Sequence, residues 1–564
     1  MTAHGDNARP EPREPRPDFS MNRQFLRLPK VSRPLRIGIV CSDGKIPRYA
    51  RQIVADIEAC NFARLACIVA WPAATKPPPS PRRSLLYWLY DRLLEPAAQT
   101  DHDPLQRVEF TAETACPVLT ADGRSRQTVE RQLREQRLDV LLNFASAEAS
   151  QWLAQTARHG VWFYRLDAQE IDGNGEPLVR KVLEDPANTA HIMLLAQRGG
   201  EAAVLREARF ALTLSLSASE NRYAPYFGST WFVIEQLAAL ASQGKLRPRR
   251  MTKHSLPAPP GPGNGQIVRY LGRRLRGIVP RLPSLLRHRK PAVDWKIALR
   301  RATYPLPEEN ANIALGQFRW LQSPPGRFWA DPFLLRHDGR LWLFFEEYDR
   351  DRGKGHIACT EVDANGNPGT PVTVLEKPWH LSYPQVFELD GTIYMIPESV
   401  EHQTVDLYRA RHFPDDWVHE KQLLDVAVVD ATLHRHNGRW WMFASPMAVP
   451  GHAPVTCLWT ADELTGEWKI ASNLCVSDDV RHARNAGAVF RHQGRLYRVS
   501  QDCSARYGSA LWFNRIEQWD DDHYREHPAK RIGGEPVAGL SGIHSYNRIG
   551  DLEVIDGRFE TFVS

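Results

Sequence analysis

The stretch RFWADPFLLRHDGRLWLFFEE, Arg327 to Glu347, carries the pattern that decides the fold. Two apolar runs flank the dipeptide Asp338-Gly339, and Asp-Gly between such runs is a strong signal for a two-residue β-hairpin turn. The carboxylate of Asp331 stands just ahead of the first run and outside the turn. We therefore predict a hairpin with an acidic side chain at the start of its first strand.

Four further segments repeat this form of a strand, a polar turn ending in glycine, and a second strand. They are YPQVFELDGTIYMIPES, DATLHRHNGRWWMFASP, NAGAVFRHQGRLYRVSQ and DLEVIDGRFETFVS, and the turn glycines of the five repeats are Gly339, Gly391, Gly438, Gly494 and Gly557. Strand-forming segments that contain Trp lie between the repeats, so each unit of about fifty residues holds four strands. Radially repeated four-stranded units are typical of a propeller. The sequence predicts a five-bladed β-propeller over residues 301–564.

Polar residues begin the first strands of these repeats, where the strands of a propeller surround one mouth of the central channel. A ring of carboxylates there suits glycosidic-bond chemistry, in which a protonated carboxyl donates to the leaving oxygen and an ionised one acts as base or nucleophile. The catalytic residues that we predict are Asp331, Asp430, Glu398 and Glu347. The substrate-binding residues that we predict are Trp329, Tyr383, Gln385, Arg484, Asn485, His544 and Tyr546.

A structural role is the alternative for several acids. An Asp at a strand start can cap a turn or accept from backbone amides, and Asp-Gly and Asn-Gly turns are structural. We expect function at Asp331 and Asp430, because both precede the strand and lie outside the turn, and both roles stay open for Glu398 and Glu347. The turn residues to which we give the structural role are Asp338, Asp390, Asn437 and Asp556.

Residues 34–243 alternate strand and helix patterns. The segment PLRIGIVCSDGKIPRYARQIVADIEAC combines a β-branched run, a glycine-containing turn and apolar residues at helical spacing, and two similar units follow. This pattern predicts an open α/β sheet of the Rossmann type. Residues 1–33 are rich in proline and charge without an apolar core, so we predict a disordered leader and not a signal peptide.

Residues 244–300 form a predicted linker. Its first part is LPAPPGPGNG, and its second part is QIVRYLGRRLRGIVPRLPSLLRHRK, where apolar residues alternate with arginines. Between Lys245 and Lys290 there are 13 Lys/Arg and no Asp/Glu, so the net charge of +6 is concentrated here. Residues 267–290 are typical of a helix on an anionic membrane surface, and the alternative is a linker helix docked on a domain. Since Tyr270 is the single interleaved aromatic, we expect no nucleic acid.

The eight cysteines are scattered, without a CxxC pair or a Cys/His cluster at zinc spacing. This argues against a disulfide framework and a structural metal, and we expect no cofactor. No apolar run approaches the ~20 residues that span a bilayer. We expect a cytoplasmic protein. If residues 267–290 contact a membrane, we expect the protein to lie at the periphery of the inner membrane.

The segments FWADPFL, LSYPQVFELDGTIYMIPES, VVDATLHRHNGRWWMFAS and RNAGAVF occur in this order and resemble the propeller at the N-terminus of plant glucosamine inositolphosphorylceramide transferases. That domain is in turn similar to the five-bladed catalytic propellers of glycoside hydrolase families 43, 32 and 68. The hydrolase resemblance implies a first-blade aspartate as base or nucleophile, which Asp331 matches. The remaining two hydrolase acids are not both matched, because blade two offers YPQ and blade three offers Asp430.

The segment LDVLLNFASAEASQWLAQTARHGVWFYRLD resembles the fold of methionyl-tRNA and sugar-nucleotide formyltransferases. Those enzymes carry Asn and His at positions where this chain has Phe163 and Arg165, so the resemblance implies the fold without that reaction.

We expect a multidomain, carbohydrate-active protein of surface glycan or glycolipid metabolism, whose propeller performs glycosyl transfer or glycoside hydrolysis. Its substrate would be a sugar, a nucleotide-sugar or a lipid-linked glycan. One alternative is a non-catalytic glycan-binding propeller. The other is a formyl or one-carbon transferase that acts on a sugar nucleotide through the N-terminal domain.

Overall fold

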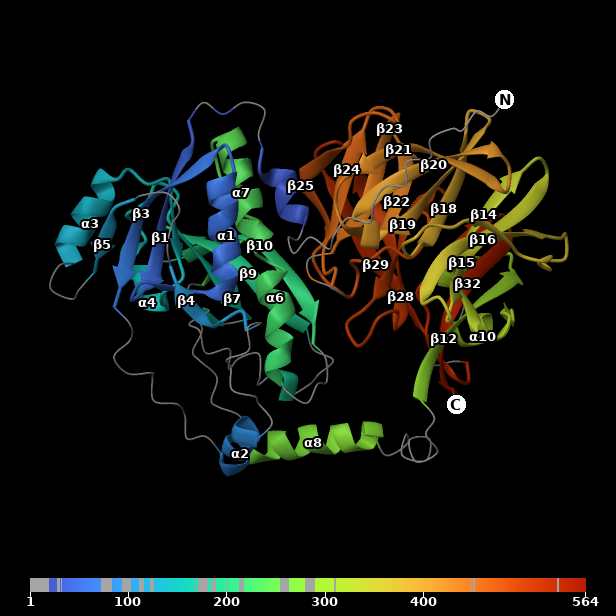
Figure 1. Ribbon diagram of the computed structural model, residues 1–564, viewed down its shortest axis with the longest axis horizontal. Coiled ribbons are helices and arrows are strands. Elements are labelled where there is room, and N and C mark those ends of the chain that lie inside the picture. The colour runs from blue at the N-terminus through green and yellow to red at the C-terminus, as the bar shows by residue number, and fades with distance from the viewer. Residues whose placement is uncertain are drawn as a thin grey trace, which may run out of the picture.

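The structure is a computed structural model with two domains side by side (Figure 1). Most of the predicted leader lies outside the described residues. The residues that the structure describes are 20–27, 31, 33–72, 84–93, 103–110, 116–121, 126–167, 169–170, 181–183, 189–199, 201–212, 218–253, 263–278, 290–308, 311–447, 449, 452–534 and 537–563.

One 11-stranded sheet forms the N-terminal domain. Five parallel strands stand in the order β5-β3-β1-β6-β7, and antiparallel β9, β10 and β11 extend the β7 edge. Numbered along the chain, the parallel part has the 3-2-1-4-5 order of a doubly wound sheet. The strands are β1 (Leu35–Ser42), β2 (Lys45–Pro47), β3 (Ala63–Trp71), β4 (Arg107–Glu109), β5 (Val118–Thr120), β6 (Val140–Asn143), β7 (Val161–Leu166), β8 (Gln169–Glu170), β9 (Thr189–Gln197), β10 (Glu201–Ala211) and β11 (Arg250–Lys253).

Helices cover both faces of this sheet. Ile53 of α1 and Leu237 of α7 join the hydrophobic cluster on one face, whereas Leu133 of α3 and Leu153 of α4 pack in the cluster on the other. Because helices bury both faces, the central strands are apolar throughout. The helices are η1 (Ser20–Phe25), α1 (Arg48–Ala59), α2 (Leu85–Leu93), α3 (Arg126–Glu135), α4 (Ala147–Leu153), η2 (Ala218–Arg222), α6 (Tyr223–Phe227), α7 (Trp231–Gln243) and α8 (Asn264–Ile278).

The structure moves three predicted boundaries. The short helix η1 lies within the predicted leader, and its Phe25 stacks on Trp231 of α7 with ring centroids 6.1 Å apart. Strand β11 belongs to the sheet although it follows residue 243. Strand β12 (Lys290–Arg301) belongs to the propeller although it starts before residue 301. The predicted linker 244–300 therefore contains β11 of the N-terminal domain and most of β12 of the propeller. Local sequence patterns could not show this, because each strand pairs with a segment distant in sequence.

Five sheets make up the C-terminal domain, which confirms the five-bladed propeller. Blades one to four each have four antiparallel strands in chain order. Blade one contains β14 (Arg327–His337), β15 (Arg340–Asp349), β16 (Lys354–Val362) and β17 (Val372–Leu375), and blade two contains β18 (Ser382–Leu389), β19 (Thr392–Ser399), β20 (Thr404–His412) and β21 (Asp416–Leu424). Blade three contains β22 (Val428–His436), β23 (Arg439–Pro446), β24 (Thr456–Ala461) and β25 (Lys469–Ser477), and blade four contains β26 (Phe490–His492), β27 (Arg495–Asp502), β28 (Ala510–Trp519) and β29 (Tyr524–Gly533).

The fifth blade closes the ring with both ends of the domain. It contains β12, β13 (Arg319–Trp320), β30 (Leu540–Gly542), β31 (Tyr546–Ile549) and β32 (Leu552–Val563). Strand β12 pairs with the whole length of β32, and the buried Arg300 guanidinium lies 2.6 Å from the Glu553 carboxylate across this pair. Pairing the first strand with the last leaves no open edge between the two ends of the ring. The short helices η4 (Leu306–Glu308) and α10 (Ala311–Gly316) connect β12 to β13.

The predicted fifth hairpin at Gly557 is wrong. Strand β32 runs through Gly557 without a turn, and the hairpin lies between β31 and β32, where Gly550 has a φ of +61°. At Gly557 a β-carbon would lie 2.4 Å from the ring of Trp320. The glycine is thus explained by the close approach of an indole and not by a turn.

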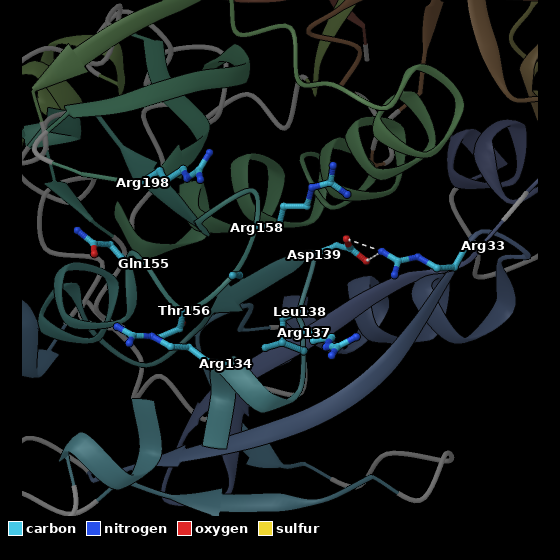
Figure 2. Close-up of a pocket in the computed structure, with 10 residues that line it drawn as sticks. Arg33, Arg134, Arg137, Leu138, Asp139, Gln155, Thr156, Arg158 and Arg198 are labelled. Atoms are coloured by element: carbon cyan, nitrogen blue, oxygen red, sulfur yellow. Dashed lines mark hydrogen bonds and ion pairs between the residues drawn. The ribbon is translucent and has the colours of Figure 1, made fainter. Parts of the chain in front are cut away.

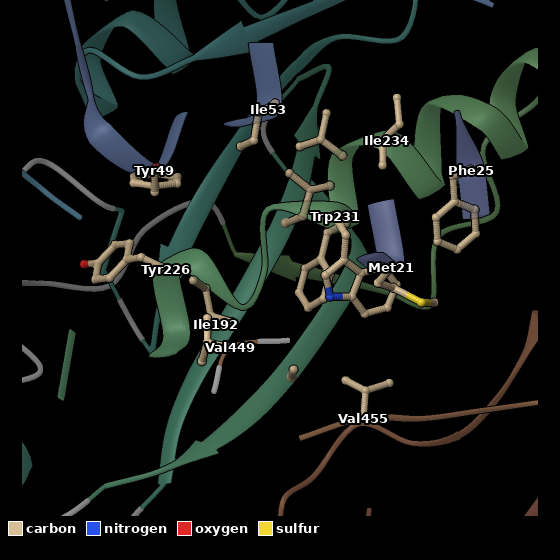
Figure 3. Packing of buried hydrophobic residues seen from close by; sticks show 14 of the residues in the cluster. Met21, Phe25, Tyr49, Ile53, Ile192, Tyr226, Trp231, Ile234, Val449 and Val455 are labelled. Carbon is tan, nitrogen blue, oxygen red and sulfur yellow. The ribbon is translucent and has the colours of Figure 1, made fainter. Parts of the chain in front are cut away.

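The two domains share a continuous core. Met21, Phe25 and Trp231 of the first domain belong to the same buried cluster as Val449 and Val455 of the propeller (Figure 3). The backbones also pair, because the Arg209 amide donates to the Asp478 carbonyl at 2.8 Å and the Val480 amide donates to the Arg209 carbonyl at 3.1 Å. Such shared apolar packing holds the propeller in a fixed orientation against α7 and β10.

Candidate active site

The same irregularity opens the first strand of blades one, two and three. In each strand a β-bulge interrupts the register, and a non-glycine residue there takes a left-handed conformation. These residues are Asp331, Tyr383 and Asp430, with φ values of +50°, +45° and +52°. A non-glycine residue in this region costs about 1–3 kcal/mol, and such strain is concentrated at functional sites. Two of the predicted catalytic residues therefore occupy strained bulges.

Carboxyl groups of neighbouring blades hold these bulges in place. The Asp331 amide donates to Asp556 Oδ2 of blade five at 2.9 Å, and the Tyr383 amide donates to Asp331 Oδ2 at 3.3 Å. The Asp430 amide donates to Glu398 Oε2 of blade two at 2.8 Å. A bulge removes its amide from the strand ladder, so an acceptor from the next blade satisfies a group that would otherwise be buried without a partner.

Five carboxyl groups form one acidic cluster, which contains Asp331, Glu346, Glu398, Asp430 and Asp556. Burial, followed by the charge of Asp430, raises the pKa of Glu398 to about 8. Burial also raises the pKa of Asp331 to about 7, with neighbouring Asp556 and Asp430 acting in the same direction. Burial and the charge of Asp331 raise the pKa of Glu346 well above its usual range. The pKa of Asp331 thus lies near neutral pH and that of Glu398 above it, so Glu398 keeps its proton at a pH where Asp331 exchanges its own.

Two cationic side chains complete the acidic cluster. Arg484 of blade four donates to both carboxylate oxygens of Asp430, at 2.7 and 3.2 Å. His544 of blade five places Nδ1 2.6 Å from Asp556 and Nε2 3.4 Å from Asp331. Burial disfavours the charged imidazole, but the charges of Asp556 and Asp331 raise the pKa of His544 above its usual value. Groups from all five blades are therefore in contact, which is possible only near the propeller axis.

One subset of the acidic cluster has metal-binding geometry. Asp331, His544 and Asp556 each offer one ligand atom, and these atoms lie within 4.8 Å of one another. Two carboxylates and one imidazole suit a divalent cation such as Ca²⁺, Mn²⁺ or Zn²⁺. All three side chains are nearly inaccessible to solvent, so an ion there would be buried.

Aromatic rings border the acidic cluster on one side. Trp295 of β12 stacks on His544 with ring centroids 3.9 Å apart, and Tyr507 stands edge-on to the same imidazole at 5.3 Å. The Arg484 guanidinium lies 4.7 Å from the centre of the Tyr507 ring. Tyr507 is 45% exposed, whereas Trp295 is 6% exposed. An accessible aromatic face beside carboxyl groups is suited to stacking against a sugar ring.

The sequence of this domain matches a known family. Residues 303–544 match the family model described as glucosamine inositolphosphorylceramide transferase 1, N-terminal. Proteins named glucosamine inositolphosphorylceramide transferase 1 from Oryza sativa subsp. japonica and Arabidopsis thaliana are 36% and 37% identical to it, over 210 and 207 residues. Each match covers 36% of this chain, and it spans only 28% and 27% of the two relatives.

Solved propeller structures give weaker matches. The catalytic domain of the Coprinopsis cinerea GH62 α-L-arabinofuranosidase matches 42% of this chain and 92% of its own, with 12% identity and a TM-score of 0.33. The structure of the RS223 β-xylosidase matches 36% of this chain and 74% of its own, with 15% identity and a TM-score of 0.30.

Most of the acidic cluster falls within the part that resembles the glucosamine inositolphosphorylceramide transferases. Five site residues that were predicted from the sequence lie between residues 303 and 544. They are Asp331, Glu398, Asp430, Arg484 and His544. The structure brings the five together as one group, whose members interact through hydrogen bonds and charge.

Glu347 and Trp329 lie apart from the acidic cluster. Glu347 accepts from Trp329 Nε1 at 2.8 Å and from Arg327 Nη1 at 2.5 Å, and His356 Nε2 lies 3.1 Å away. Neighbouring strand residues point to opposite faces, so Glu346 faces the acidic cluster and Glu347 faces away. We therefore assign the predicted catalytic Glu347 and the predicted substrate-binding Trp329 to the support of blade one.

Four other predicted substrate-binding residues connect blades to one another. The Tyr383 hydroxyl lies 2.9 Å from Thr432 Oγ1 and accepts from the Gly487 amide at 2.6 Å, while Gln385 bonds both ways with the Leu433 backbone. Asn485 donates to the Asp430 and Phe443 carbonyls, and the Tyr546 amide of blade five donates to the Ala486 carbonyl at 2.7 Å. All four are at most 6% exposed, so we infer that they shape the site without touching a substrate.

Sequence reasoning missed four members of the site. Glu346 follows Gly339 at the same interval as Glu398 follows Gly391, so strict counting along the repeat would have selected Glu346 and not Glu347. Asp556 was assigned to a turn that does not exist. Trp295 lies on the closing strand ahead of the repeats, and Tyr507 lies between β27 and β28, so no repeat position marks either residue.

The raised pKa of Glu398 leads to a prediction about stability and pH. Folding raises this pKa from 4.5 to about 8, so the folded protein holds a proton that the unfolded chain releases between these values. The stabilisation is complete below about pH 4.5 and is lost as pH rises through 8. Other groups also titrate over this pH range. The contribution of Glu398 is therefore measured as the difference in stability between wild type and a variant without this carboxyl.

We expect Glu398→Gln to gain stability relative to wild type between pH 5 and 8, by up to about 1.4 kcal/mol per pH unit. Urea unfolding in EDTA at several pH values checks this, since the chelator keeps divalent cations away from the neighbouring acids. A stability difference that is constant with pH would contradict a raised pKa at Glu398.

Glu347→Gln supplies a matched test of the reassigned residue. Burial opposes its charge, but bonds from His356 and Trp329 and the charge of Arg327 lower the pKa of Glu347 to about 2. The charged hydrogen bonds that it accepts are worth about 1.5–3 kcal/mol. We expect Glu347→Gln to lose about that much stability in urea unfolding at pH 7 while its turnover stays close to the wild-type value. A large loss of turnover in a folded variant would return Glu347 to the active site.

A cleft lies in the N-terminal domain and has a different character. This cleft of about 570 Å³ is bordered by Arg33, Arg134, Arg137, Arg158 and Arg198, and Figure 2 shows Arg33 paired with Asp139. The cleft lies at the amino ends of β6 and β7, whereas open α/β sheets bind ligands at the carboxyl ends. Arginine stays protonated and cannot exchange protons at neutral pH, so we assign the chemistry to the acidic cluster.

Proposed function

We propose that the propeller binds a sugar and catalyses glycosyl transfer or glycoside hydrolysis in glycolipid or surface-glycan metabolism. The observation that carries this proposal is the acidic cluster, where carboxyls from four blades meet Arg484 of the remaining blade. Cleavage of a glycosidic bond needs one protonated and one ionised carboxyl on either side of the reacting carbon. The raised pKa values of Glu398 and Asp331 supply both states near neutral pH.

Each group has a role in this proposal. Glu398 is the proton donor to the leaving oxygen, because it keeps its proton to about pH 8. Asp331 is the base or nucleophile, on the strained bulge of the first blade. Arg484 binds an anionic or hydroxyl-rich part of the substrate, and the exposed ring of Tyr507 stacks on the sugar. The names of the matched relatives support a sugar donor and a glycolipid acceptor.

A substrate screen of the full chain tests the proposal. The purified protein is incubated with nucleotide sugars, lipid-linked sugars and aryl glycosides, and released or transferred sugar is measured by mass spectrometry. Turnover of any of these classes supports catalysis by the propeller. Saturable sugar binding without turnover would replace the proposal by a glycan-binding propeller, and the absence of both would refute it.

For the N-terminal domain we propose a formyltransferase-like fold that does not perform formyl transfer. The strand order of its parallel part is compatible with that resemblance. Phe163 and Arg165, which stand where those enzymes have Asn and His, are only 3% and 4% exposed within β7. Neither can act as a general base toward an amine at neutral pH. Location in the cytoplasm remains a prediction from the sequence.

A further inference from the structure

Helices α2 and α8 carry an unusual concentration of exposed apolar side chains. Among the described residues, 13 large hydrophobic side chains are exposed, and seven of them lie on these two helices. The seven are Leu85, Trp88, Leu89, Leu93, Val268, Leu271 and Leu275, with exposures from 39% to 72%. Single exposed apolar residues are ordinary, whereas a contiguous group marks an interaction surface. We call these seven residues the apolar face.

The opposite sides of both helices are packed into the protein. Tyr90 of α2 contacts Tyr270 of α8 edge-to-face with centroids 5.9 Å apart, and Asn264 Oδ1 accepts from the Leu86 amide at 2.9 Å. Tyr87, Tyr90, Ile267 and Tyr270 are at most 3% exposed. Both helices are therefore docked through one side. Their other side is nevertheless apolar.

Helical geometry explains how each helix divides its surface. Leu85, Trp88 and Leu89 are spaced by three and four residues and share one side of α2, while Tyr87 and Tyr90 share another. Val268, Leu271 and Leu275 are related in the same way on α8. Figure 1 shows the two helices adjacent to each other along one edge of the molecule, outside both domains. Nothing in the described structure covers the apolar face.

The charged residues of α8 are all basic. Helix α8 contains four arginines and no Asp or Glu in its sequence NGQIVRYLGRRLRGI. On α2, the Arg92 guanidinium lies 5.6 Å from the ring of Trp88. Basic residues beside leucine and tryptophan fit the boundary between anionic headgroups and acyl chains, where apolar side chains insert and arginines contact phosphates. No helix in the described part of the chain is long and apolar enough to cross a bilayer.

We propose that α2 and α8 together form a docking surface for a lipid bilayer that contains anionic lipids. The apolar face inserts into the headgroup region, and the exposed Arg269 of α8 contacts lipid phosphates. The helices lie in the plane of the membrane and hold the chain at its surface. This inference does not rest on the proposed sugar chemistry, because it uses neither the acidic cluster nor any substrate.

Flotation of the full chain with vesicles tests the docking surface. Wild-type protein is mixed with vesicles of phosphatidylcholine alone or with about 30% phosphatidylglycerol, at low and high NaCl. We expect binding to the anionic vesicles that is at least about tenfold stronger than to neutral ones and that weakens with salt. The double variant Leu271→Asp/Leu275→Asp is expected to lose at least about tenfold in binding, because it places charge in the inserted layer.

Two controls keep the result interpretable. Val372→Asp changes an equally exposed apolar residue of the propeller, far in sequence from both helices, and should bind vesicles like wild type. Arg269→Glu alters charge alone on an exposed position of α8 and should weaken only the binding to anionic vesicles. Thermal melts confirm that each variant is folded. Wild type that does not bind, or a double variant that binds equally, overturns the proposal. Concentration-dependent dimerisation that the double variant abolishes also overturns it, by showing that a second copy covers the apolar face.

Discussion

Glu398→Gln is expected to lower turnover of the sugar substrate by about 10²–10⁴-fold, the contribution typical of a positioned proton donor. The physical reason is the site of the carboxyl. Burial and the charge of Asp430 raise the pKa of Glu398 to about 8, so the group still carries a proton at the pH where Asp331, whose pKa is about 7, loses its own. Glutamine has the same shape but no acidic proton. Initial rates of wild type and variant on one substrate give the measurement.

The fold of the Glu398→Gln variant should survive. The Asp430 amide donates to Glu398 Oε2 at 2.8 Å, and the amide oxygen of glutamine can accept the same bond. The wild-type rate should fall as pH rises past about 8, because the donor then loses its proton. A wild-type rate that stays level to pH 10 would exclude Glu398 as the proton donor, and so would a variant with full activity.

Glu553→Gln is expected to destabilise the protein by about 3–5 kcal/mol, because it leaves a buried charge without a partner. Glu553 accepts from Arg300 Nε at 2.7 Å, from the Leu306 amide at 2.7 Å and from the Tyr546 hydroxyl at 2.5 Å. The two charged side chains are 1% and 0% exposed. This pair joins β12 to β32, so its loss weakens the closure of the ring. Urea unfolding at pH 7 measures the difference.

The neighbouring pair at the end of the same two strands offers a control. Arg301 donates to Asp551 at 2.7 Å, but these side chains are 36% and 55% exposed. Solvent screens such a pair, and Asp551→Asn should change the free energy of unfolding by no more than about 1 kcal/mol. Similar losses for the two variants would show that burial of the Arg300–Glu553 pair is not what closes the ring.

The propeller could be predicted from the sequence because its signals are local. Asp-Gly and Asn-Gly turns such as Asp338-Gly339 mark hairpins, and the apolar runs beside them mark strands. The fifth blade could not be predicted in the same way. Its outer pairing joins β12 to β32, which are separated by the whole propeller, and its hairpin has glycine in the first turn position, Gly550, instead of the second.

The candidate site was predictable where the repeat places residues, and not elsewhere. Asp331 and Asp430 occupy equivalent bulges, so one repeat position identified both. Glu346 and Glu347 are adjacent, and only the interval from the turn glycine, which is the same for Glu346 after Gly339 as for Glu398 after Gly391, separates them. Tyr507 and Trp295 reach the site from a loop and from the closing strand, and their positions depend on packing between blades that no local pattern encodes.

The ratio of turnover between Glu398→Gln and Glu347→Gln, on the substrate that wild type converts, tests most directly whether the acidic cluster performs the chemistry. Both changes replace a glutamate of blade one or two by its amide, and only Glu398 belongs to the acidic cluster. The expected ratio is about 0.01 or lower, with both variants folded. A ratio near one would contradict the assignment of the active site to these carboxyl groups.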